Sequence, residues 1–473
     1  MPPAPWTAAF ARPTILTQPI PMVIALAAAL MIPALWNGYP LLYFDTIDYI
    51  TLGFTWKLPI YRTAGYGFVA LVGWVARTVW VTLIVQCLVV AYVLYEARRL
   101  LVPELRGWRL VLVLAIAFTV TSLPWVASSI MPDVFTAPAV LLTLMLALHE
   151  AELTAARKWI FVLLLGIACM THPTHTAMIA GLSVCVFVLD QMARRGWAFA
   201  RMRVRYVLAG LAVGVILSVA ANWVATGRAF FTPRTTPLLT MAVLFERGLG
   251  QRYLADTCGQ PGVRQSVLCA YRAEIPADAN EFLWHNPNFW KMGGWAVLLP
   301  EAGRDLEAIV RRYPIEFATN AAMLTLEQLV VIKTAEGFRT MEGFVDSEIR
   351  KFYPRDYPRF FKARQQSYPE VTDSPLPLIN RVHVPAMLAG TCLLVAVVVL
   401  ALRRRARTTA TLATLVLLAY LGNAFICGAV SNPADRYGSR LAWLTALTAI
   451  VLLPRVMRSH AHGAGRETSS AAD

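Results

Sequence analysis

The chain has 473 residues, of which 57% are hydrophobic and 15% are charged, and its mean hydropathy is +0.54. A soluble domain is usually about 45–50% apolar and about 25% charged, so this composition excludes an ordinary soluble protein. The formal net charge is +15, but the basic residues cluster in short segments between apolar runs, as in the cytoplasmic loops of membrane proteins. We therefore expect contact with membrane lipid and no nucleic-acid partner.

Apolar runs recur along the whole chain, and a run of about 20 residues can cross a bilayer core of about 30 Å. They predict an all-α polytopic membrane protein with about ten transmembrane helices. The first run has no small-residue cleavage site after it, so we interpret it as a retained span and not as a cleaved signal peptide. The predicted spans are 20–36, 77–96, 109–127, 134–149, 158–171, 174–191, 206–225, 384–402, 409–428 and 439–454.

The positive charges predict the orientation. Short loops rich in Lys and Arg stay cytoplasmic, and with the N-terminus inside, every basic cluster and the C-terminus fall inside too. The number of spans within 134–191 is the open point. A single crossing over 158–191 would place the cluster from Arg194 to Arg205 outside, which favours a hairpin of two short helices that turns at Thr171 to His175. The expected location is the inner membrane of a bacterium.

The same pattern divides the chain into four parts. An N-terminal transmembrane module covers 1–225 and includes a first external loop at 37–76. A long external, periplasmic segment covers 226–383, and its aromatic residues and amphipathic stretches predict a helical cap on the membrane surface. C-terminal transmembrane helices cover 384–454, and 455–473 is expected to be a disordered cytoplasmic tail.

Two of the seven cysteines stand apart from the others. Cys258 and Cys269 are the only cysteines in the external segment, and they lie eleven positions apart. In an oxidising compartment they are expected to form a disulfide. The remaining five lie in or beside spans, where cysteine usually serves as a small buried apolar residue.

The first external loop carries two acids with the spacing of a helix face. Asp45 and Asp48 are three positions apart, so both carboxylates would point to one side of a helix. One could act as general base toward an acceptor hydroxyl, while the other orients that hydroxyl or holds a cation. The alternative is that one or both cap the start of a surface helix, a position that Asp favours.

The segment YRTAGY at 61–66 follows these acids and adds candidate substrate-binding residues. Arg62 could grip a phosphate in bidentate fashion, and Tyr66 lies in the same segment. The alternative for Arg62 is an interfacial arginine whose charge snorkels to water. Asp133 opens a later span and is a further candidate, with helix capping as its alternative.

His172 and His175 lie at the predicted hairpin turn. Two histidines without a nearby acid are a weak metal signal, so the metal assignment stays unknown. Hydrogen bonding to a sugar or phosphate is one interpretation, and structural hydrogen bonding is the other.

The last external loop, 431–440, is dense in polar groups between two very apolar spans. Ionisable groups near a membrane are costly and are usually paired or functional. Asp435, Arg436 and Arg440 are candidates for ligand binding, with an internal ion pair as the alternative. Arg234, in a Thr-Pro-Arg segment after the seventh span, is a further phosphate candidate.

The first loop and the layout of the chain resemble the GT-C superfamily of membrane glycosyltransferases, which includes the protein mannosyltransferases and the aminoarabinose transferases. The likeness rests on FDTIDY at 44–49, on LPIYRTAGY at 58–66 and on a large external segment late in the chain. In that family the first-loop acid is the catalytic base and the donor is a polyprenyl-phosphate sugar. The resemblance implies the role of base for Asp45, with Asp48 second.

The resemblance implies an inverting glycosyltransferase that moves a sugar from a polyprenyl-phosphate donor to a cell-envelope acceptor on the outer face of the membrane. Two alternatives stay open: a transporter or flippase of a lipid-linked glycan, and a non-catalytic envelope-assembly protein. No cofactor is certain, and a divalent cation stays open. The sequence gives neither the sugar, nor the acceptor, nor the oligomeric state.

Overall fold

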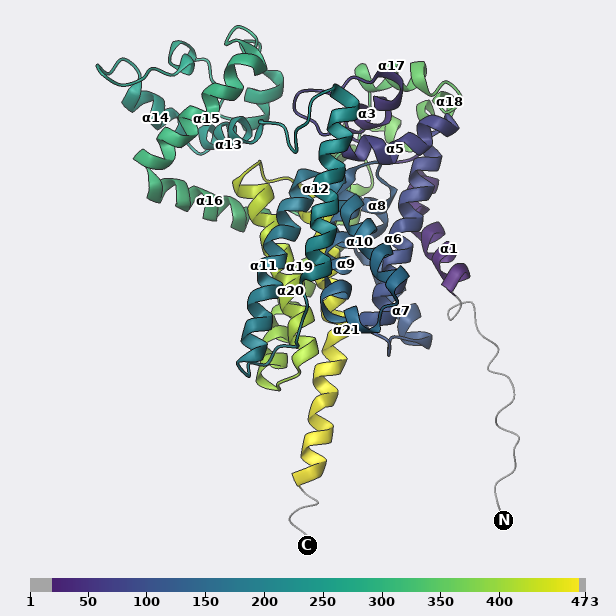
Figure 1. Ribbon diagram of the computed structural model, residues 1–473. Helices are drawn as coiled ribbons and strands as arrows, with labels where there is room; N and C mark the ends of the chain where they lie inside the picture. The colour runs from purple at the N-terminus through teal and green to yellow at the C-terminus, as the bar shows by residue number, and fades with distance from the viewer. Residues whose placement is uncertain (1–18, 468–473) are drawn as a thin grey trace, which may run out of the picture.

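The computed structural model describes residues 19–467, with side chains as far as Arg458. This part of the chain is helical and forms no strand, and a single isolated bridge pairs Leu41 with Ser129. Long helices run side by side as a bundle, and shorter helices gather at the upper end of the bundle in Figure 1.

The elements fall into three groups along the chain. The first 226 residues contain α1 (Pro19–Leu30), α2 (Ile32–Asn37), α3 (Thr46–Ile50), α4 (Leu52–Thr55), α5 (Gly65–Ala76), α6 (Val79–Leu101), α7 (Gly107–Val120), α8 (Leu123–Ser128), η2 (Pro132–Phe135), α9 (Thr136–Leu148), η3 (Glu150–Glu152), α10 (Ala155–Thr171), α11 (Pro173–Arg194) and α12 (Arg205–Thr226). The middle contains α13 (Thr236–Glu246), α14 (Leu249–Thr257), η4 (Val267–Tyr271), η5 (Glu281–His285), α15 (Gly294–Arg312), α16 (Pro314–Gln328), α17 (Phe344–Phe352), α18 (Tyr357–Phe361), η6 (Arg364–Ser367) and η7 (Val371–Asp373). The last group is α19 (Leu376–Arg403), α20 (Arg407–Ala424), η8 (Phe425–Ala429) and α21 (Asp435–Glu467).

Six helices of the described chain are long and apolar enough to cross a membrane: α6, α11, α12, α19, α20 together with η8, and α21 up to Arg458. The chain is therefore a multi-pass membrane protein. The count of about ten spans is not established, because several predicted spans coincide with shorter or broken helices. The span predicted at 20–36 is divided into α1 and α2, with Pro33 in the first turn of α2. The span predicted at 109–127 is divided into α7 and α8 at Thr121 and Ser122.

The predicted hairpin within 158–191 is present as two separate helices. α10 ends at Thr171 and α11 begins at Pro173, with the extended residue His172 between them. Proline suits the first turn of α11 because that turn has no intrahelical partner for its N–H. The charge rule therefore identified the turn correctly.

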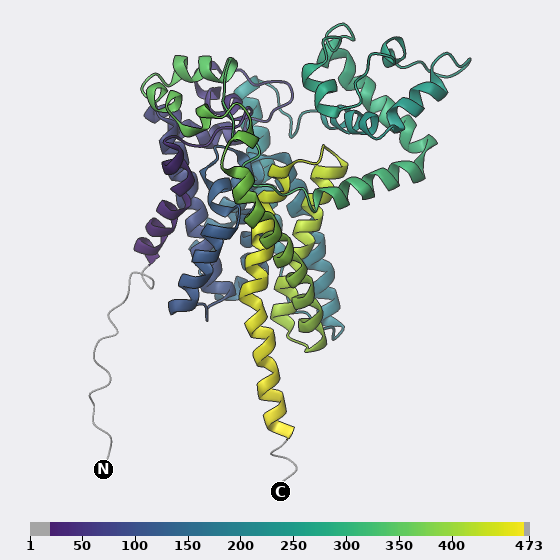
Figure 2. The same cartoon turned by 180° about the vertical axis from the view of Figure 1, so that it is seen from behind.

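The long segment predicted to form one cap contains two bodies in the structure. Residues 236–328, here called the helical cap, have a hydrophobic core of their own, which includes Phe245, Phe282 and Leu298. Residues 334–374, here called the loop clamp, instead contribute Met341 and Ile349 to the main core. Figures 1 and 2 show the helical cap standing to one side of the bundle, while α17 and α18 of the loop clamp lie above α5 and beside α3.

The loop clamp holds the first loop in place through buried hydrogen bonds. The Gln365 side chain accepts from the backbone N–H of Leu42 at 3.2 Å and donates to the carbonyl of Leu42 at 2.8 Å. Tyr353 donates to the carbonyl of Ile50 at 2.7 Å. Asp356 accepts from the N–H of Val79 at 2.8 Å, at the first residue of α6. Since buried bonds of this kind leave costly unpaired groups when broken, the loop has one well-defined position.

Cys258 and Cys269 form a disulfide inside the helical cap, with their Cα atoms 5.5 Å apart. Closing a loop of this length stabilises a domain by about 2–4 kcal/mol, since the cross-link restricts the unfolded chain. We expect Cys258→Ser to make the helical cap markedly more sensitive to limited proteolysis, while the transmembrane helices stay protected. The matched control is Cys392→Ser, because Cys392 is a free, exposed cysteine. Equal proteolysis of the two variants would contradict this expectation.

The last helix extends beyond its predicted end at residue 454. α21 continues to Glu467, so the tail predicted as disordered from 455 begins as a helical extension. Residues 468–473 of that predicted tail lie outside the described part of the chain.

Candidate functional site

The two acids of the first loop converge on one arginine. Asp45 precedes α3 and Asp48 lies in its first turn, so the two carboxylates share a side of this short helix. Arg62 forms an ion pair with Asp45, and its Nε donates to Asp48 Oδ2 at 3.0 Å. The side chain of Asp45 makes no capping hydrogen bond to α3. Helix capping therefore does not explain Asp45.

A second arginine reaches the same acid from the far end of the chain. Arg436, at the start of α21, donates from Nη1 to Asp45 Oδ2 at 2.9 Å. Its backbone N–H donates to Glu336 at 2.8 Å, and its guanidinium lies 4.5 Å from the centre of the Tyr43 ring. Arg436 Nε is buried and has no hydrogen-bond partner within residues 19–458. A buried donor without a partner is uncommon and marks a place where a ligand oxygen would be favourable.

A glycine allows α21 to approach this closely. A Cβ on Gly438 would lie 2.1 Å from the carbonyl oxygen of Val331, so any larger residue there would push α21 away. A Cβ on Gly337 would lie 2.0 Å from the Tyr43 ring, which packs beside Arg436. The sequence at 337 and 438 thus permits the first loop, the 328–337 segment and α21 to meet.

Arg440, one turn further along α21, forms a deeper pair. It donates from Nη1 to Asp133 Oδ1 at 2.9 Å and to Asn423 Oδ1 from Nε and Nη2 at 3.0 and 2.8 Å. Arg440 is 2% exposed and Asp133 8%. Its Nη2 also lies 3.1 Å from the sulfur of Cys427, which belongs to the π-helical turn η8. Every one of these partners is internal, so Arg440 positions the start of α21 and is not free to bind a ligand.

The two histidines have different surroundings. His175 is fully buried, and its Nδ1 lies 2.9 Å from the carbonyl of Ala168, which requires Nδ1 to carry the proton. Its Nε2 then accepts from Thr136 at 2.8 Å, so His175 is neutral and structural. His172 caps α11, because its Nδ1 accepts from the backbone N–H of Thr174 at 3.2 Å. Burial, and to a smaller extent the neighbouring His175, holds the pKa of His172 well below its usual value, so the ring is neutral. Because Nδ1 accepts, the proton is on Nε2, which can donate a hydrogen bond.

Three of the sequence-derived candidates do not join this cluster. Tyr66 is buried and donates to Gln86 at 2.8 Å inside the bundle. Asp435 accepts from the backbone N–H of Lys333 at 2.7 Å, which is a structural contact at the start of α21. Arg234 is exposed in the turn between α12 and α13, and no hydrogen bond or ion pair of its side chain occurs in the described chain.

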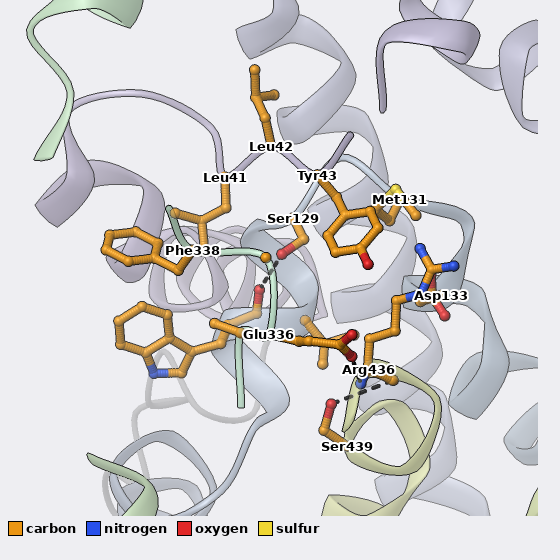
Figure 3. A pocket seen from close by; sticks show the side chains of 14 residues that line it. Leu41, Leu42, Tyr43, Ser129, Met131, Asp133, Glu336, Phe338, Arg436 and Ser439 are labelled. Atoms are coloured by element: carbon orange, nitrogen blue, oxygen red, sulfur yellow. Dashed lines mark hydrogen bonds between the residues drawn. The ribbon is translucent and has the colours of Figure 1, made fainter. Parts of the chain in front are cut away.

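Arg436 lines a partly open pocket, whose empty volume of about 530 Å³ includes space open to the outside. Figure 3 shows Tyr43, Asp133, Arg436 and Glu336 around it, with Leu41 and Phe338 along the opposite wall. A pocket with one apolar wall and a few convergent polar groups has the general form of a small-molecule site. Glu336 was missed at the level of sequence, where the only signal was an isolated acid followed by a glycine.

Electrostatics separate the three carboxylates of the cluster that lie outside the membrane-spanning helices. Burial raises the pKa of Asp45, but the guanidiniums of Arg436 and Arg62 outweigh it and lower that pKa to about 2. Burial dominates at Asp48, where the single contact with Arg62 leaves the pKa raised. Burial also raises the pKa of Glu336, against the opposing charge of Arg436. Asp45 is therefore fully ionised, and Asp48 and Glu336 hold protons more readily.

The raised pKa of Glu336 gives a testable pH dependence. A carboxyl group with a raised folded-state pKa favours folding below its unfolded-state pKa, and that contribution is lost as pH rises through the folded-state pKa. We expect Glu336→Gln to remove this loss and to raise the unfolding midpoint by a few degrees at pH 8 but not at pH 4. Thermal unfolding in detergent across this range measures it. The exposed Glu342→Gln is the control, and parallel curves for Glu336→Gln and wild type would contradict the assignment.

The cluster offers little to a metal ion in its present arrangement. Within the described chain, no group of three or more His, Cys, Asp or Glu side chains has a suitable arrangement. Asp45 and Asp48 both already pair with arginine. What the arrangement provides is two guanidiniums, Arg62 and Arg436, that face one carboxylate beside a pocket, which is a donor set suited to an anionic oxygen.

Comparison of the chain with protein-family models, with curated proteins and with solved structures finds no match.

Proposed function

We propose that the protein is an integral-membrane glycosyltransferase of the GT-C type that transfers a sugar, with inversion, from a polyprenyl-phosphate donor to a cell-envelope acceptor. The observation that carries this proposal is the meeting of Arg62 and Arg436 on Asp45. These residues are up to 391 positions apart in the chain. The arrangement joins two fixed cations, one acid and a pocket at one end of a membrane bundle.

The two arginines suit the leaving group of such a donor. When the glycosidic bond to a phosphate breaks, negative charge develops on the phosphate oxygens, and preorganised cations stabilise it best in a partly dry site. Arg62 and Arg436 are both mostly shielded from solvent, with side chains 16% and 20% exposed. The buried Nε of Arg436 supplies a donor that no protein group uses.

Asp45 is the proposed base, with Asp48 second. The acceptor hydroxyl oxygen attacks the anomeric carbon of the sugar and forms the new glycosidic bond. The bond from that carbon to the phosphate oxygen breaks, and its electron pair leaves with the phosphate. The hydroxyl proton passes to Asp45. As the arginines turn from Asp45 toward the phosphate, the pKa of Asp45 rises toward its ordinary value, which makes the carboxylate a better base.

The distribution of basic residues supports a site on the outer face. The last turns of α6, α11 and α19 carry Arg98 and Arg99, Arg194, and Arg403 respectively. The site lies at the other end of the bundle, since it uses Arg436 at the start of α21. Because Lys and Arg favour the cytoplasmic side, this supports an N-terminus and a C-terminus in the cytoplasm of a bacterium.

The test compares surface glycans and glycolipids of a deletion strain that carries wild-type protein, Asp45→Asn or Arg62→Ala. Membrane abundance of each protein is measured in parallel. We expect deletion to remove or alter one glycan, wild type to restore it, and both variants to accumulate without restoring it.

Two outcomes would redirect the assignment. Full restoration of the glycan by Asp45→Asn would exclude Asp45 as the catalytic base and would favour a non-catalytic protein of envelope assembly. Failure of restoration together with unchanged transfer in isolated membranes would favour a transporter or flippase of a lipid-linked glycan, which a flipping assay in proteoliposomes would then detect.

A further inference from the structure

α7 is apolar over most of its surface, apart from Arg109 and Thr119, yet hardly packs on the bundle. Only Leu110 and Ala117 of its 14 residues are buried. Trp108 is 70% exposed, and Val111 and Leu112 are exposed too. A helix that is apolar over most of its surface and has an exposed face is suited to lipid on that face.

Between α7 and the rest of the bundle lies a partly open cavity, whose empty volume of about 1040 Å³ includes space open to the outside. Its walls come from α1, α6, α7, α9, α20 and α21, and they are formed almost entirely by aliphatic side chains such as Leu26, Leu101, Leu144 and Leu447. Within the described chain, Arg98 is the one charged residue that lines it.

Water does not stably occupy a space like this, because an ordered water needs two to four polar partners. The cavity lies among helices long enough to span a membrane, including α6, α20 and α21. The surrounding solvent is therefore hydrocarbon, and an acyl chain matches the apolar chemistry of the walls.

The mouth of the cavity is positively charged. Arg98 lies in the last turn of α6, donates from Nε to the carbonyl of Leu105 at 2.9 Å, and pairs with no carboxylate of the described chain. Arg106 is exposed nearby and likewise bonds only to a carbonyl, that of Pro103. In contrast, Arg99 pairs with Glu96 at 2.6 Å. Two arginines without acidic partners at the end of an apolar cavity complement an anionic headgroup.

We propose that this cavity binds one acyl chain of an anionic phospholipid, whose phosphate contacts Arg98 and Arg106. The lipid fills the gap behind α7 and fixes α7 against the bundle. This site does not rest on the proposed transferase function, because Arg98 is at the opposite end of α6 from the first loop.

The experiment is native mass spectrometry of the full-length protein after delipidation, with phosphatidylglycerol or phosphatidylcholine of identical acyl chains added back. We expect wild type to retain phosphatidylglycerol in preference, and Arg98→Gln to lose about five-fold in retention, since one cation near a headgroup contributes about 1 kcal/mol. Arg403→Gln is the matched control, because Arg403 is an exposed arginine in the last turn of α19 that does not line the cavity.

A second variant tests the apolar part of the site. Ala117→Phe fills the cavity from α7 and should lower retention of both phospholipids, and Leu447→Phe does the same from α21 if the first variant fails to accumulate. Equal retention of both lipids with no effect of Arg98→Gln would overturn the proposal. Displacement of phosphatidylglycerol by added polyprenyl phosphate, with loss of that displacement in the filled variant, would also overturn it, because the cavity would then serve a polyprenyl chain.

Discussion

Replacing Arg440 by methionine is expected to lower the free energy of unfolding by about 3–5 kcal/mol, because it leaves the carboxylate of Asp133 buried without a counter-charge. Both side chains are almost inaccessible, at 2% for Arg440 and 11% for Asp133. The same change also removes both hydrogen bonds to Asn423. Unfolding of the detergent-solubilised protein, followed by intrinsic fluorescence during titration with SDS, measures the loss.

The double variant Arg440→Met with Asp133→Leu separates burial of a lone charge from loss of packing. Replacing both partners with apolar side chains of similar size is often close to neutral, so we expect most of the stability to return. Arg458→Met is the control on the same helix, since Arg458 is exposed and its replacement should change stability by less than about 0.5 kcal/mol. If Arg440→Met were as stable as Arg458→Met, the pair would have no structural role.

Local pattern was sufficient for much of the helical layout. The apolar runs near 77–96, 174–191 and 206–225 correspond to α6, α11 and α12. The spacing of Asp45 and Asp48 correctly placed both acids on one side of a short helix, where they share Arg62. These features depend on residues close together in the chain, so the sequence alone contains the information.

Long-range partners could not be read from local pattern. Arg440 is a candidate for ligand binding at the level of sequence, with an internal ion pair as the alternative, and its partner in the structure is Asp133, which lies 307 positions away. The sequence around Glu336 gave almost no indication of a functional site. Its place in the pocket depends on Gly337, because only a residue without a side chain lets the Tyr43 ring pack against position 337. The division of 226–383 into the helical cap and the loop clamp also depends on tertiary contacts. Hydropathy reports burial of a segment but not the surface against which it is buried.

Replacing Arg436 by alanine is expected to lower the rate of the proposed transfer about 10²–10³-fold, the loss typical of removing one preorganised donor to a developing negative charge. Arg436 contacts Asp45 at 2.9 Å and presents a buried, unused Nε beside the pocket. Arg436→Lys should lose less, about ten-fold, because it keeps the charge but cannot present a planar pair of donors. The measurement is the rate of glycan formation in isolated membranes, normalised to protein abundance.

Arg234→Ala supplies the matched control and should leave the rate unchanged, since Arg234 is exposed and its side chain makes no hydrogen bond or ion pair within the described residues. The pH dependence gives an independent readout. The guanidinium of Arg436 lowers the pKa of Asp45 more than that of Arg62 does, so its removal raises that pKa. Because a base acts only when it is deprotonated, the acid limb of the pH profile of kcat/KM should move to higher pH in Arg436→Ala, since kcat/KM reports the free enzyme, in which Arg436 still contacts Asp45. A lower rate with an unchanged acid limb would assign Arg436 to phosphate binding alone and would exclude Asp45 as the base. An unchanged rate would show that Arg436 takes no part in the transfer.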